Sequence, residues 1–414
     1  MRAWPRVPLK HVVDINRRVL PENTPPDTEF RYIDISTCGR GRLEAEPQSM
    51  RFADAPSRAR RLVRQGDTII STVRTYLRAV WPVAGPADDL VVSTGFAVLS
   101  PRGQLDPRFL GWVAQSDLVI AEIVARSVGV SYPAINGLEV GELQVPVPDL
   151  AVQRAIADFL DAETGHIDSL IGRKREVLDL IAQRRTSLVT ALVARGRGAT
   201  PRADLPWLTA VPSSWPSVPL GLLADVFNGS TPQRDEGDGG DIPWTTSGEI
   251  DQGVITVPTA YISEEARRAH GLRIAPAGSI VVGLVGQGRT RGLRARLGIS
   301  TTLNQNLAAI CPRDDRLDSS YVGLLLGLAY DDLRNGGRGG NQAALNCEMI
   351  KAYRIPVAPR DEQARLVEEF TVEVTRDGAM AALLTKSIED LLERRQALIT
   401  AAVNGQVKVP GVAG

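Results

Sequence analysis

The chain has 414 residues, enough for two to four domains, and its 43% hydrophobic and 23% charged residues are ordinary for a globular protein. Its 48 basic and 48 acidic residues give a formal net charge of zero, so the overall charge does not by itself indicate a nucleic-acid partner. No run of 18 apolar residues occurs, which excludes a membrane-spanning helix, and the start after Met1 lacks the apolar stretch of a signal peptide. The three cysteines lie far apart, which excludes a disulfide framework and a cysteine zinc site. These features predict a cytoplasmic protein.

The first part of the chain predicts a compact mixed α/β domain. Short strand-like runs occur at Arg31–Ile35, Asp67–Ile70 and Ala97–Leu99, and Gly, Pro and Asp separate them. A helical pattern follows over Pro107–Arg126.

A basic stretch lies inside this domain. Seven arginines occur between Arg51 and Arg78, against only Asp54 and Asp67. Arginine presents a planar fork that suits phosphate and the O6/N7 edge of guanine, so the stretch favours contact with DNA. The alternative is a bias toward arginine throughout the chain, because only five of the 48 basic residues are lysine.

A long helix is predicted after Pro146 and Pro148. Apolar residues follow a spacing of four and three, which makes a stripe for a partner helix; they are Ile167, Ile171, Leu178, Ile181 and Leu188. About 30 residues at 1.5 Å each give a rod of roughly 45 Å, longer than a domain this small needs. A helix packed on its own domain is the alternative interpretation.

A Gly/Pro/Ser-rich linker over residues 197–214 leads into a second part with the same organisation. Strand-like runs at Ser279–Val282 and Leu307–Ile310 precede a helical pattern over Ser319–Arg334. Seven arginines and no acidic residue lie between Ala266 and Ser300. A second apolar stripe then predicts a second long helix; it comprises Leu384, Ile388, Leu391 and Leu398.

The two parts repeat each other. Trp4-Pro5-x-Val7-Pro8-Leu9 returns as Trp215-Pro216-x-Val218-Pro219-Leu220 at an offset of 211 residues. Gln153, Arg184-Arg185 and Leu188 return as Gln363, Arg394-Arg395 and Leu398 at an offset of 210. The period is far longer than that of a solenoid, so two copies of a whole domain with its helix are predicted. Duplex DNA, which has pseudo-dyads, is a matching partner, whereas duplication for stability alone is the alternative.

No catalytic motif is found. The chain has no G-x-x-x-x-G-K-[ST] sequence, and Gly283–Gly292 lacks both the spacing and the lysine of a phosphate loop. His11, His166 and His270 are scattered and form no metal site or triad. The glycine-rich segments 283–292 and 334–342 instead suit close approach to a DNA backbone, with a simple hairpin turn as the alternative for the first.

Several further motifs resemble one family. They are Gly129-x-Ser131-Tyr132-Pro133-Ala134-Ile135-Asn136, Val145-Pro146-Val147-Pro148, Ile156-Ala157-x-Phe159-Leu160-Asp161, Arg184-Arg185-x-x-Leu188, Trp207-Leu208-x-x-Val211-Pro212-x-x-Trp215, Gly229-Ser230-Thr231-Pro232 and Ile242-Pro243-Trp244. In this order the chain resembles the specificity (S) subunits of type I restriction–modification enzymes over nearly its whole length.

The resemblance implies an α+β fold in which two similar mixed α/β target-recognition domains are separated by two long antiparallel helices, a coiled coil, with an internal pseudo-two-fold duplication. It implies recognition domains over residues 1–149 and 215–358, helical spacers over 150–196 and 359–405, the linker 197–214 and a flexible tail over 406–414. Each recognition domain would read half of a split DNA sequence. The helices would dock two methyltransferase (M) subunits and, through them, restriction (R) subunits. S-adenosylmethionine, ATP and Mg would belong to those partners, and this chain would be non-catalytic.

Two sets of candidate residues follow. The DNA-binding set combines arginine, polar and aromatic residues of both halves: Arg58, Arg74, Tyr76, Arg78, Ser131, Tyr132, Gln287, Arg289, Thr290, Arg291, Arg294, Asn304, Gln305, Arg338, Asn341 and Gln342. The set for helix pairing and partner docking comprises the two apolar stripes: Ile167, Ile171, Leu178, Ile181, Leu188, Leu384, Ile388, Leu391 and Leu398.

Two other functions stay open at this point. A coiled-coil scaffold that never touches DNA would make the arginine stretches incidental. A fused methyltransferase would need cofactor and catalytic signatures, and Asn23-Thr24-Pro25-Pro26-Asp27 lacks the aromatic residue of an Asn-Pro-Pro-Tyr motif.

Overall fold

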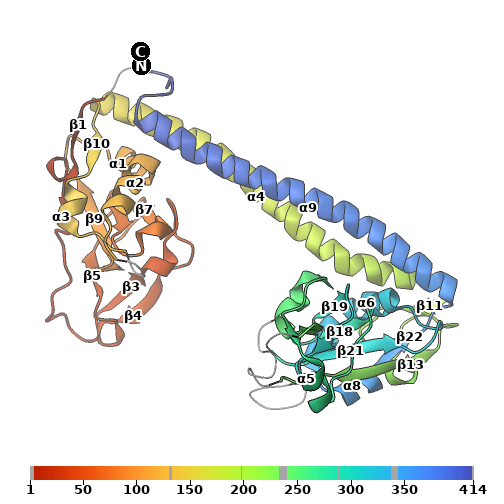
Figure 1. Cartoon of the computed structure of the whole chain (residues 1–414). Coiled ribbons are helices and arrows are strands. Elements are labelled where there is room, and N and C mark those ends of the chain that lie inside the picture. The colour runs from red at the N-terminus through yellow and green to blue at the C-terminus, as the bar shows by residue number, and fades with distance from the viewer. Residues whose placement is uncertain are drawn as a thin grey trace. The chain divides into compact units, whose positions relative to one another are not determined.

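The structure is a computed structural model that describes residues 4–129, 133–196, 198–232, 240–286, 289–336 and 344–412, with only the backbone described at 185, 186 and 252. The chain forms two compact units (Figure 1). Unit 1 comprises Met1–Arg175 and Leu384–Gly414, and unit 2 comprises Glu176–Leu383. Each unit therefore combines one mixed α/β domain with parts of both long helices.

Unit 1 contains short strands and helices, and the first long helix begins in it. Its strands are β1 (Arg6–Pro8), β2 (Val13–Ile15), β3 (Glu29–Ile33), β4 (Gln48–Arg51), β5 (Ala59–Leu62), β6 (Thr68–Ser71), β7 (Val80–Pro82), β8 (Leu90–Ser93), β9 (Phe96–Pro101) and β10 (Gln144–Pro146). Its short helices are α1 (Pro107–Gln115), α2 (Asp117–Arg126) and α3 (Gly137–Gly141), with 3-10 turns η1 (Leu9–His11), η2 (Ile35–Thr37), η3 (Phe52–Asp54) and η4 (Thr75–Leu77).

Three sheets organise unit 1. An antiparallel sheet has the order β2-β9-β6-β7, and a second sheet has the order β4-β3-β8-β5, in which β3 and β8 are parallel. β1 and β10 form a separate antiparallel pair. The β6 and β8 strands are buried along their whole length, which explains why they read as continuous apolar runs.

Unit 2 repeats this construction. Its strands are β11 (Ala199–Thr200), β12 (Val211–Pro212), β13 (Ser217–Pro219), β14 (Ala224–Asn228), β15 (Ile242–Thr245), β16 (Val254–Ile255), β17 (Ala260–Ile262), β18 (Ile280–Gly283), β19 (Arg294–Leu297), β20 (Thr302–Leu303), β21 (Leu307–Pro312) and β22 (Arg354–Pro356). Its short helices are α5 (Glu264–Ala269), α6 (Ser319–Leu328), α7 (Tyr330–Asn335) and α8 (Cys347–Ala352), with 3-10 turns η5 (Leu220–Leu222) and η6 (Ser247–Gln252).

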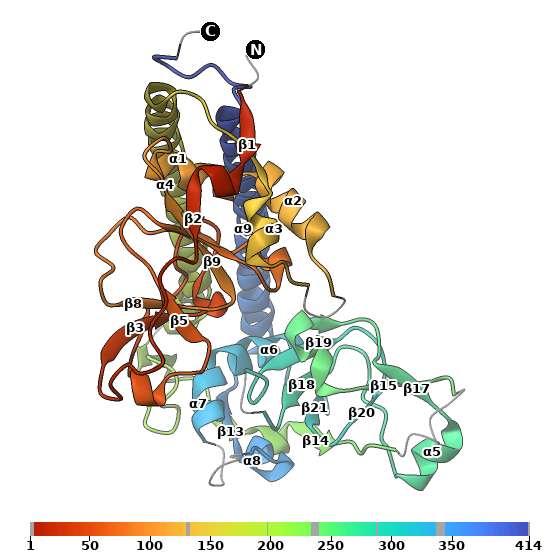
Figure 2. The same cartoon turned by 90° about the vertical axis from the view of Figure 1, so that its left-hand side faces the viewer.

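The main sheet of unit 2 has the order β14-β21-β18-β19-β16, so its first four strands match β2-β9-β6-β7 of unit 1 one for one. A β13–β22 pair repeats β1–β10, and a smaller sheet has the order β17-β15-β20. Figure 2 labels β14, β21, β18 and β19 in a view turned by 90° from that of Figure 1. The duplication predicted from the sequence is therefore present in the sheet topology.

A buried glutamine repeats in both units and joins the start of each long helix to its domain. Gln153 Oε1 accepts from the main-chain N–H of Asp106 at 2.8 Å, and its Nε2 donates to the oxygens of Gln104 and Pro148. Gln363 repeats the contact with the N–H of Asp318 at 2.8 Å. Asp106 and Asp318 in turn cap the N-termini of α1 and α6.

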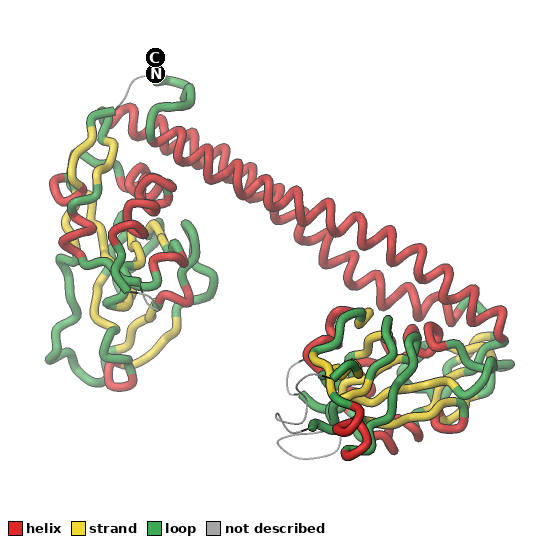
Figure 3. Tube along the Cα trace, viewed as in Figure 1, coloured by secondary structure: helices red, strands yellow, loops and turns green. Residues whose placement is uncertain are grey.

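The two long helices are α4 (Leu150–Ala194), with 45 residues, and α9 (Arg360–Val403), with 44. At 1.5 Å per residue α4 measures about 68 Å, more than the roughly 45 Å expected from its apolar stripe. The helices pair in antiparallel fashion: within unit 1 Arg395 of α9 bonds Asp168 of α4, and within unit 2 Arg184 of α4 bonds Asp377 of α9. Figure 3 shows both helices in red.

The ends of the long helices lie inside domain cores, which explains the extra length. In unit 1 the core joins Ile156 and Leu160 of α4 with Ile399 and Val403 of α9. In unit 2 the core joins the C-terminal end of α4, at Val189, Leu192 and Val193, with Leu366 near the start of α9. Each long helix is therefore part of both cores. The long helices thus pair with each other and also pack on the domains, as the two alternative interpretations of their apolar stripes expected.

The segment after α9 differs from the flexible tail expected from the sequence. Val409 is 4% exposed and belongs to the unit 1 core, and Val407 and Val412 pack against it. Arg6 donates to the Asn404 side chain at 3.1 Å, which ties the start of unit 1 to the end of α9. Its glycines and proline suggested disorder, but Val409 is buried and Val407 and Val412 are half-buried. Among the described residues no helix is apolar and long enough to cross a membrane.

Candidate nucleic-acid interface

In unit 1 a tight loop presents the candidates Arg74, Tyr76 and Arg78. Arg74 and Arg78 have φ of 50° and 55° and flank the 3-10 turn η4. Thr75 between them is buried, and its Oγ1 lies 2.9 Å from Ser127 Oγ, which anchors the loop. Tyr76 is 55% exposed. Since left-handed backbone is costly for residues other than glycine, two such residues in one loop indicate a conformation kept for a purpose.

Two of the predicted arginines of unit 1 already form ion pairs. Arg78 Nη1 lies 3.0 Å from Asp117 Oδ1 at the first turn of α2. Arg58 lies 3.5 Å from Asp34, and its side chain is 60% exposed. The longer, exposed Arg58 pair is easily exchanged for a phosphate, whereas Arg78 is held in a fixed direction.

In unit 2 the glycine-rich candidate segment connects β18 to β19. The main-chain N–H of Gly283 donates to Leu293 at 2.9 Å, and a Cβ at Gly283 would lie 2.3 Å from the oxygen of Thr290. The Tyr330 hydroxyl donates to the main-chain oxygen of Arg289 at 2.8 Å. Within the described part of this connection Arg289 is exposed, whereas Thr290 and Arg291 are half-buried. β18 and β19 pair in antiparallel fashion, as the hairpin alternative expects, but residues 287 and 288 between them lie outside the described residues.

Three other candidates of unit 2 are placed less favourably for DNA. Asn304 is 6% exposed, and its Oδ1 accepts from the N–H of Asn306 at 3.1 Å, so it stabilises a turn. Arg294 is half-buried on β19, and a Cβ at Gly327 of α6 would lie 2.7 Å from its Nη2. Gln305 is exposed but accepts from the hydroxyl of Thr231. Burial argues against direct base reading by Asn304 and Arg294.

The remaining candidates, Ser131, Tyr132, Gln287, Arg338, Asn341 and Gln342, lie outside the described residues. Their contact with DNA stays a prediction.

The acid-free stretch of unit 2 finds its counter-ions elsewhere in the unit. Arg267 and Arg268 bond Glu264, which stands just outside the stretch, and the hydrogen bond from Arg267 is the main cause that lowers the pKa of Glu264 to about 2. Arg273 bonds Asp225 at 3.2 Å and lies 3.9 Å over the ring of Phe227. These three arginines therefore have structural roles, and the cationic surface of this stretch is smaller than its sequence suggested.

The helix-pairing candidates are all buried or half-buried. Ile167 and Ile171 are each 4% exposed and Ile388 is 8% exposed. Five further candidates are half-buried: Leu178, Ile181, Leu188, Leu384 and Leu391. Leu398 is also half-buried and packs against the unit 1 core.

Sequence reasoning missed a second apolar feature of these helices. In unit 2 five large apolar side chains of α4 and α9 are 42–70% exposed: Val177, Leu180, Val372, Met380 and Leu383. Val372, Met380 and Leu383 share one face of α9, because their spacings of eight and three residues return to the same side of a helix. The heptad analysis could not separate them from the inner stripe, since both are apolar.

Sequence reasoning also missed Arg40, which lies beside Arg78. Arg40 forms a bridge with Val80 at the start of β7 and is exposed at its surface. A lone arginine between two glycines in a loop carries no sequence signal for a site. Only the tertiary structure brings it to the candidate loop.

Catalytic chemistry has little support in the described part of the chain. It contains no group of three or more His, Cys, Asp or Glu side chains placed to hold a metal ion. Burial raises the pKa of the Cys38 thiol to about 12, and burial is also the main cause that raises the pKa of Cys311 and of Cys347. A raised thiol pKa lowers the thiolate fraction, which disfavours a nucleophilic role for these cysteines.

Comparison with known proteins agrees with this picture. Residues 212–372 match the family model of the type I restriction modification DNA specificity domain. The resemblance to type I specificity subunits is confirmed. The specificity subunit of EcoR124I/EcoR124II from Escherichia coli is 26% identical over 176 residues, which are 41% of this chain and 43% of that protein. The matched region thus spans under half of that relative's length. The HindI specificity subunit from Haemophilus influenzae is 21% identical over 418 residues, covering 86% of this chain and 89% of that relative.

Solved structures share the fold. A chain from work on complex assembly and conformational transition of the type I R-M system has a TM-score of 0.79 and 23% identity, covering 98% of this chain and 99% of that one. The HsdS subunit from Thermoanaerobacter tengcongensis has a TM-score of 0.50 and 24% identity, covering 98% and 97%. The family match and the named relatives make the chain similar to type I specificity subunits, and the solved structures show that it shares their fold.

Proposed function

We propose that this specificity subunit reads a bipartite DNA sequence, one half-site per unit, and docks two methyltransferase subunits and, through them, restriction subunits. The observation that carries the proposal is the duplication in three dimensions. Both units have the strand order β2-β9-β6-β7 or its counterpart β14-β21-β18-β19, and both attach a long helix through a buried glutamine. Two equivalent readers in one chain fit a target with two parts.

The loops of the two units support the DNA half of this proposal. Unit 1 presents Arg74 and Tyr76 on a loop with left-handed residues at both ends, and unit 2 presents an exposed Arg289 between β18 and β19. Arginines and aromatic residues held on rigid loops are suited to phosphate contact, base-edge hydrogen bonds and stacking. The two loops differ in shape and sequence, which would let the two half-sites differ.

The exposed apolar side chains of α4 and α9 support the docking half. An isolated soluble helix pair places charged residues on its outer faces, whereas Leu180, Met380 and Leu383 are 61%, 50% and 70% exposed. Covering them with a partner would remove this apolar area from water. A methyltransferase subunit is the partner that the family assignment suggests.

Catalysis is assigned to the partners. The methyltransferase subunits would supply S-adenosylmethionine and the adenine pocket, and the restriction subunits would supply ATP and Mg. This chain would supply sequence recognition and position those sites along the duplex.

The test is reconstitution. The purified chain alone is expected neither to methylate DNA nor to hydrolyse ATP, whereas the chain with its methyltransferase subunits is expected to methylate adenine at a two-part site. Methylation mapping by sequencing reads out the site. A chain that binds the methyltransferase but shows no affinity for duplex, alone or in the complex, would favour the scaffold interpretation. Methyl transfer by the isolated chain would favour an enzyme.

A further inference from the structure

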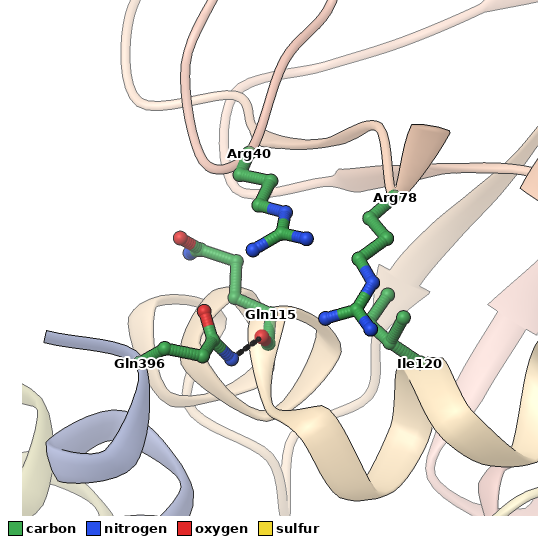
Figure 4. Close-up of a pocket in the computed structure, with 5 residues that line it drawn as sticks. All are labelled: Arg40, Arg78, Gln115, Ile120 and Gln396. Atoms are coloured by element: carbon green, nitrogen blue, oxygen red, sulfur yellow. Dashed lines mark hydrogen bonds between the residues drawn. The ribbon is translucent and has the colours of Figure 1, made fainter. Parts of the chain in front are cut away.

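A small cavity in unit 1 lies between the recognition domain and the C-terminal part of α9. Its volume is about 10 Å³, and it is lined by Arg40, Arg78, Gln115, Ile120 and Gln396. Figure 4 shows the guanidinium groups of Arg40 and Arg78 pointing toward the same space above Gln115 and Ile120. A cavity of this size accepts about one oxygen atom.

The cavity is built from fixed parts. Main-chain hydrogen bonds join Val80 to Gly39 at 2.9 Å and Gly41 to Val80 at 2.7 Å, so Arg40 is held across from the strand that follows Arg78. Gly41 has a φ of 77°, and a Cβ there would lie 2.1 Å from Gln115 Oε1, so the loop presses directly on α1. The main-chain position of Arg40 is therefore fixed beside β7 by the fold.

The wall on the helix side is equally fixed. Gln396 of α9 donates to the main-chain oxygen of Gln115 at 2.8 Å. The hydroxyl of Thr400, one turn further along α9, accepts from the N–H of Asp117 at 3.0 Å. Gln115 is 7% exposed, and its Oε1 has no hydrogen-bond donor among the described residues.

The charges at the cavity do not balance. Arg78 bonds Asp117, but Arg40 has no hydrogen bond or ion pair with the described residues. Partial burial, and next the neighbouring charge of Arg78, lower the pKa of Arg40 below its usual range, although a guanidinium stays protonated at neutral pH. Two cations with one carboxylate leave a net positive charge, which an oxyanion would neutralise.

We infer that Arg40 and Arg78 form a phosphate-binding pair that holds one backbone phosphate of bound DNA at the junction of the recognition domain and α9. The inference rests on the proposed function, because it assumes that unit 1 contacts duplex. One phosphate oxygen occupies the cavity between the guanidinium groups, and the rest of the phosphate stays at its open side. The contact carries no base information, so it sets the position of the duplex against α9 rather than the sequence read.

The test compares Arg40→Ala with wild type in the full chain, alone and with its methyltransferase subunits, by duplex-binding titrations at several salt concentrations. The variant is expected to bind roughly tenfold more weakly, to the same extent on cognate and unrelated duplex. The slope of log K against log salt is expected to fall by about 0.9, the value for one phosphate. Arg40→Lys is expected to keep the slope and lose part of the affinity, because a point charge replaces the fork.

Arg17→Ala is the matched control, because this substitution removes the same charge from the same unit. The side chain of Arg17 is 73% exposed. The control variant is expected to leave the salt slope unchanged. Thermal unfolding of each variant checks that the fold is kept. If wild type binds duplex and Arg40→Ala matches it in affinity and salt slope, the assignment of Arg40 and Arg78 as a phosphate-binding pair is wrong, while the proposed function stands. If wild type binds no duplex, the proposed function fails first.

Free phosphate is the other source of the same chemistry. Inorganic phosphate is the probe, added at constant ionic strength during thermal unfolding. Stabilisation of wild type but not of Arg40→Ala, with unaltered DNA binding by the variant, would assign the pair to free phosphate and overturn the inference.

Discussion

Arg184 Nη1 on α4 lies 2.9 Å from Oδ1 of Asp377 on α9, and the Asp377 side chain is only 5% exposed while that of Arg184 is 51% exposed. A nearly buried carboxylate thus depends on an arginine that reaches it from the water side. Glu373, one turn away, bonds the same guanidinium. The pair fixes the register of the two helices within unit 2, because a shift by one residue would bury the carboxylate without its cation.

Removing this arginine is expected to destabilise unit 2. Arg184→Ala leaves Asp377 buried without its cation, and we expect a loss of about 1–3 kcal/mol in the free energy of unfolding, since the partner is half exposed. Denaturant unfolding measures the loss, and Arg175→Ala on an exposed site of α4 is the control. The double variant Arg184→Ala/Asp377→Ala should recover part of the stability. A double variant less stable than Arg184→Ala would contradict this account.

The buried glutamines are expected to matter equally in both units. Gln153→Ala leaves the N–H of Asp106 and two main-chain oxygens without partners, and each buried group left unpaired costs about 1–3 kcal/mol. We expect a total loss of about 2–4 kcal/mol, allowing for relaxation and water entry. Gln363→Ala should match it. Exposed Gln183→Ala should change the free energy of unfolding by under about 0.5 kcal/mol. A large difference between the two buried sites would contradict the structural equivalence.

The register of α4 predicts which apolar positions tolerate charge. Ile171→Asp places a carboxylate at a site that is 4% exposed, and we expect a loss of at least about 3 kcal/mol. Ile181→Asp, at a half-buried site, should cost less. Val177→Asp, at 42% exposure, should cost least. Thermal unfolding ranks the three variants, and any other order would mean that the inner face is assigned incorrectly.

Partner docking can be separated from folding. Met380 and Leu383 are 50% and 70% exposed, so Met380→Ser and Leu383→Ser should leave the unfolding temperature nearly unchanged. If a methyltransferase covers them, the double variant should weaken that complex at least tenfold, because the loss of two buried apolar side chains exceeds about 1.4 kcal/mol. Size-exclusion chromatography with purified methyltransferase measures assembly. Assembly equal to wild type would move the docking surface elsewhere.

The low pKa of Glu264 gives a pH dependence with a defined sign. Its pKa falls from 4.5 to about 2, mainly through the hydrogen bond from Arg267. A lowered folded-state pKa stabilises the folded state above pH about 4.5, and this contribution is lost as the pH falls toward 2. Glu264→Gln should therefore unfold at a slightly lower temperature than wild type at pH 6 and low salt, and the difference should shrink as the pH falls and vanish below pH about 2. An effect independent of pH would contradict the ion-pair origin.

Much of the architecture was predictable from local pattern. The runs at Asp67–Ile70 and Ser279–Val282 lie within one residue of β6 and β18, and the run at Leu307–Ile310 lies inside β21, because a buried strand needs a continuous apolar run. The expected short helices after residues 107 and 319 are present as well. The candidate site was less predictable, because exposure is a tertiary property. Asn304 and Arg294 have the right chemistry for DNA but are buried or half-buried, whereas Arg40 joins the candidate loop only through its bridge to Val80.

The sequence by itself determined the duplication, the two long helices and their inner faces, since repetition and apolar periodicity are properties of the chain alone. Only the tertiary structure decided where the helix ends lie. The sequence assigns each helix to the half that it closes, yet Ile399 and Val403 of α9 lie in the core of unit 1, and Val189 and Val193 of α4 lie in the core of unit 2. Antiparallel pairing carries each helix past its own domain, and its terminal apolar turns are then buried by the domain they reach, because leaving them in water would cost about 25 cal/mol for each Å² of apolar surface.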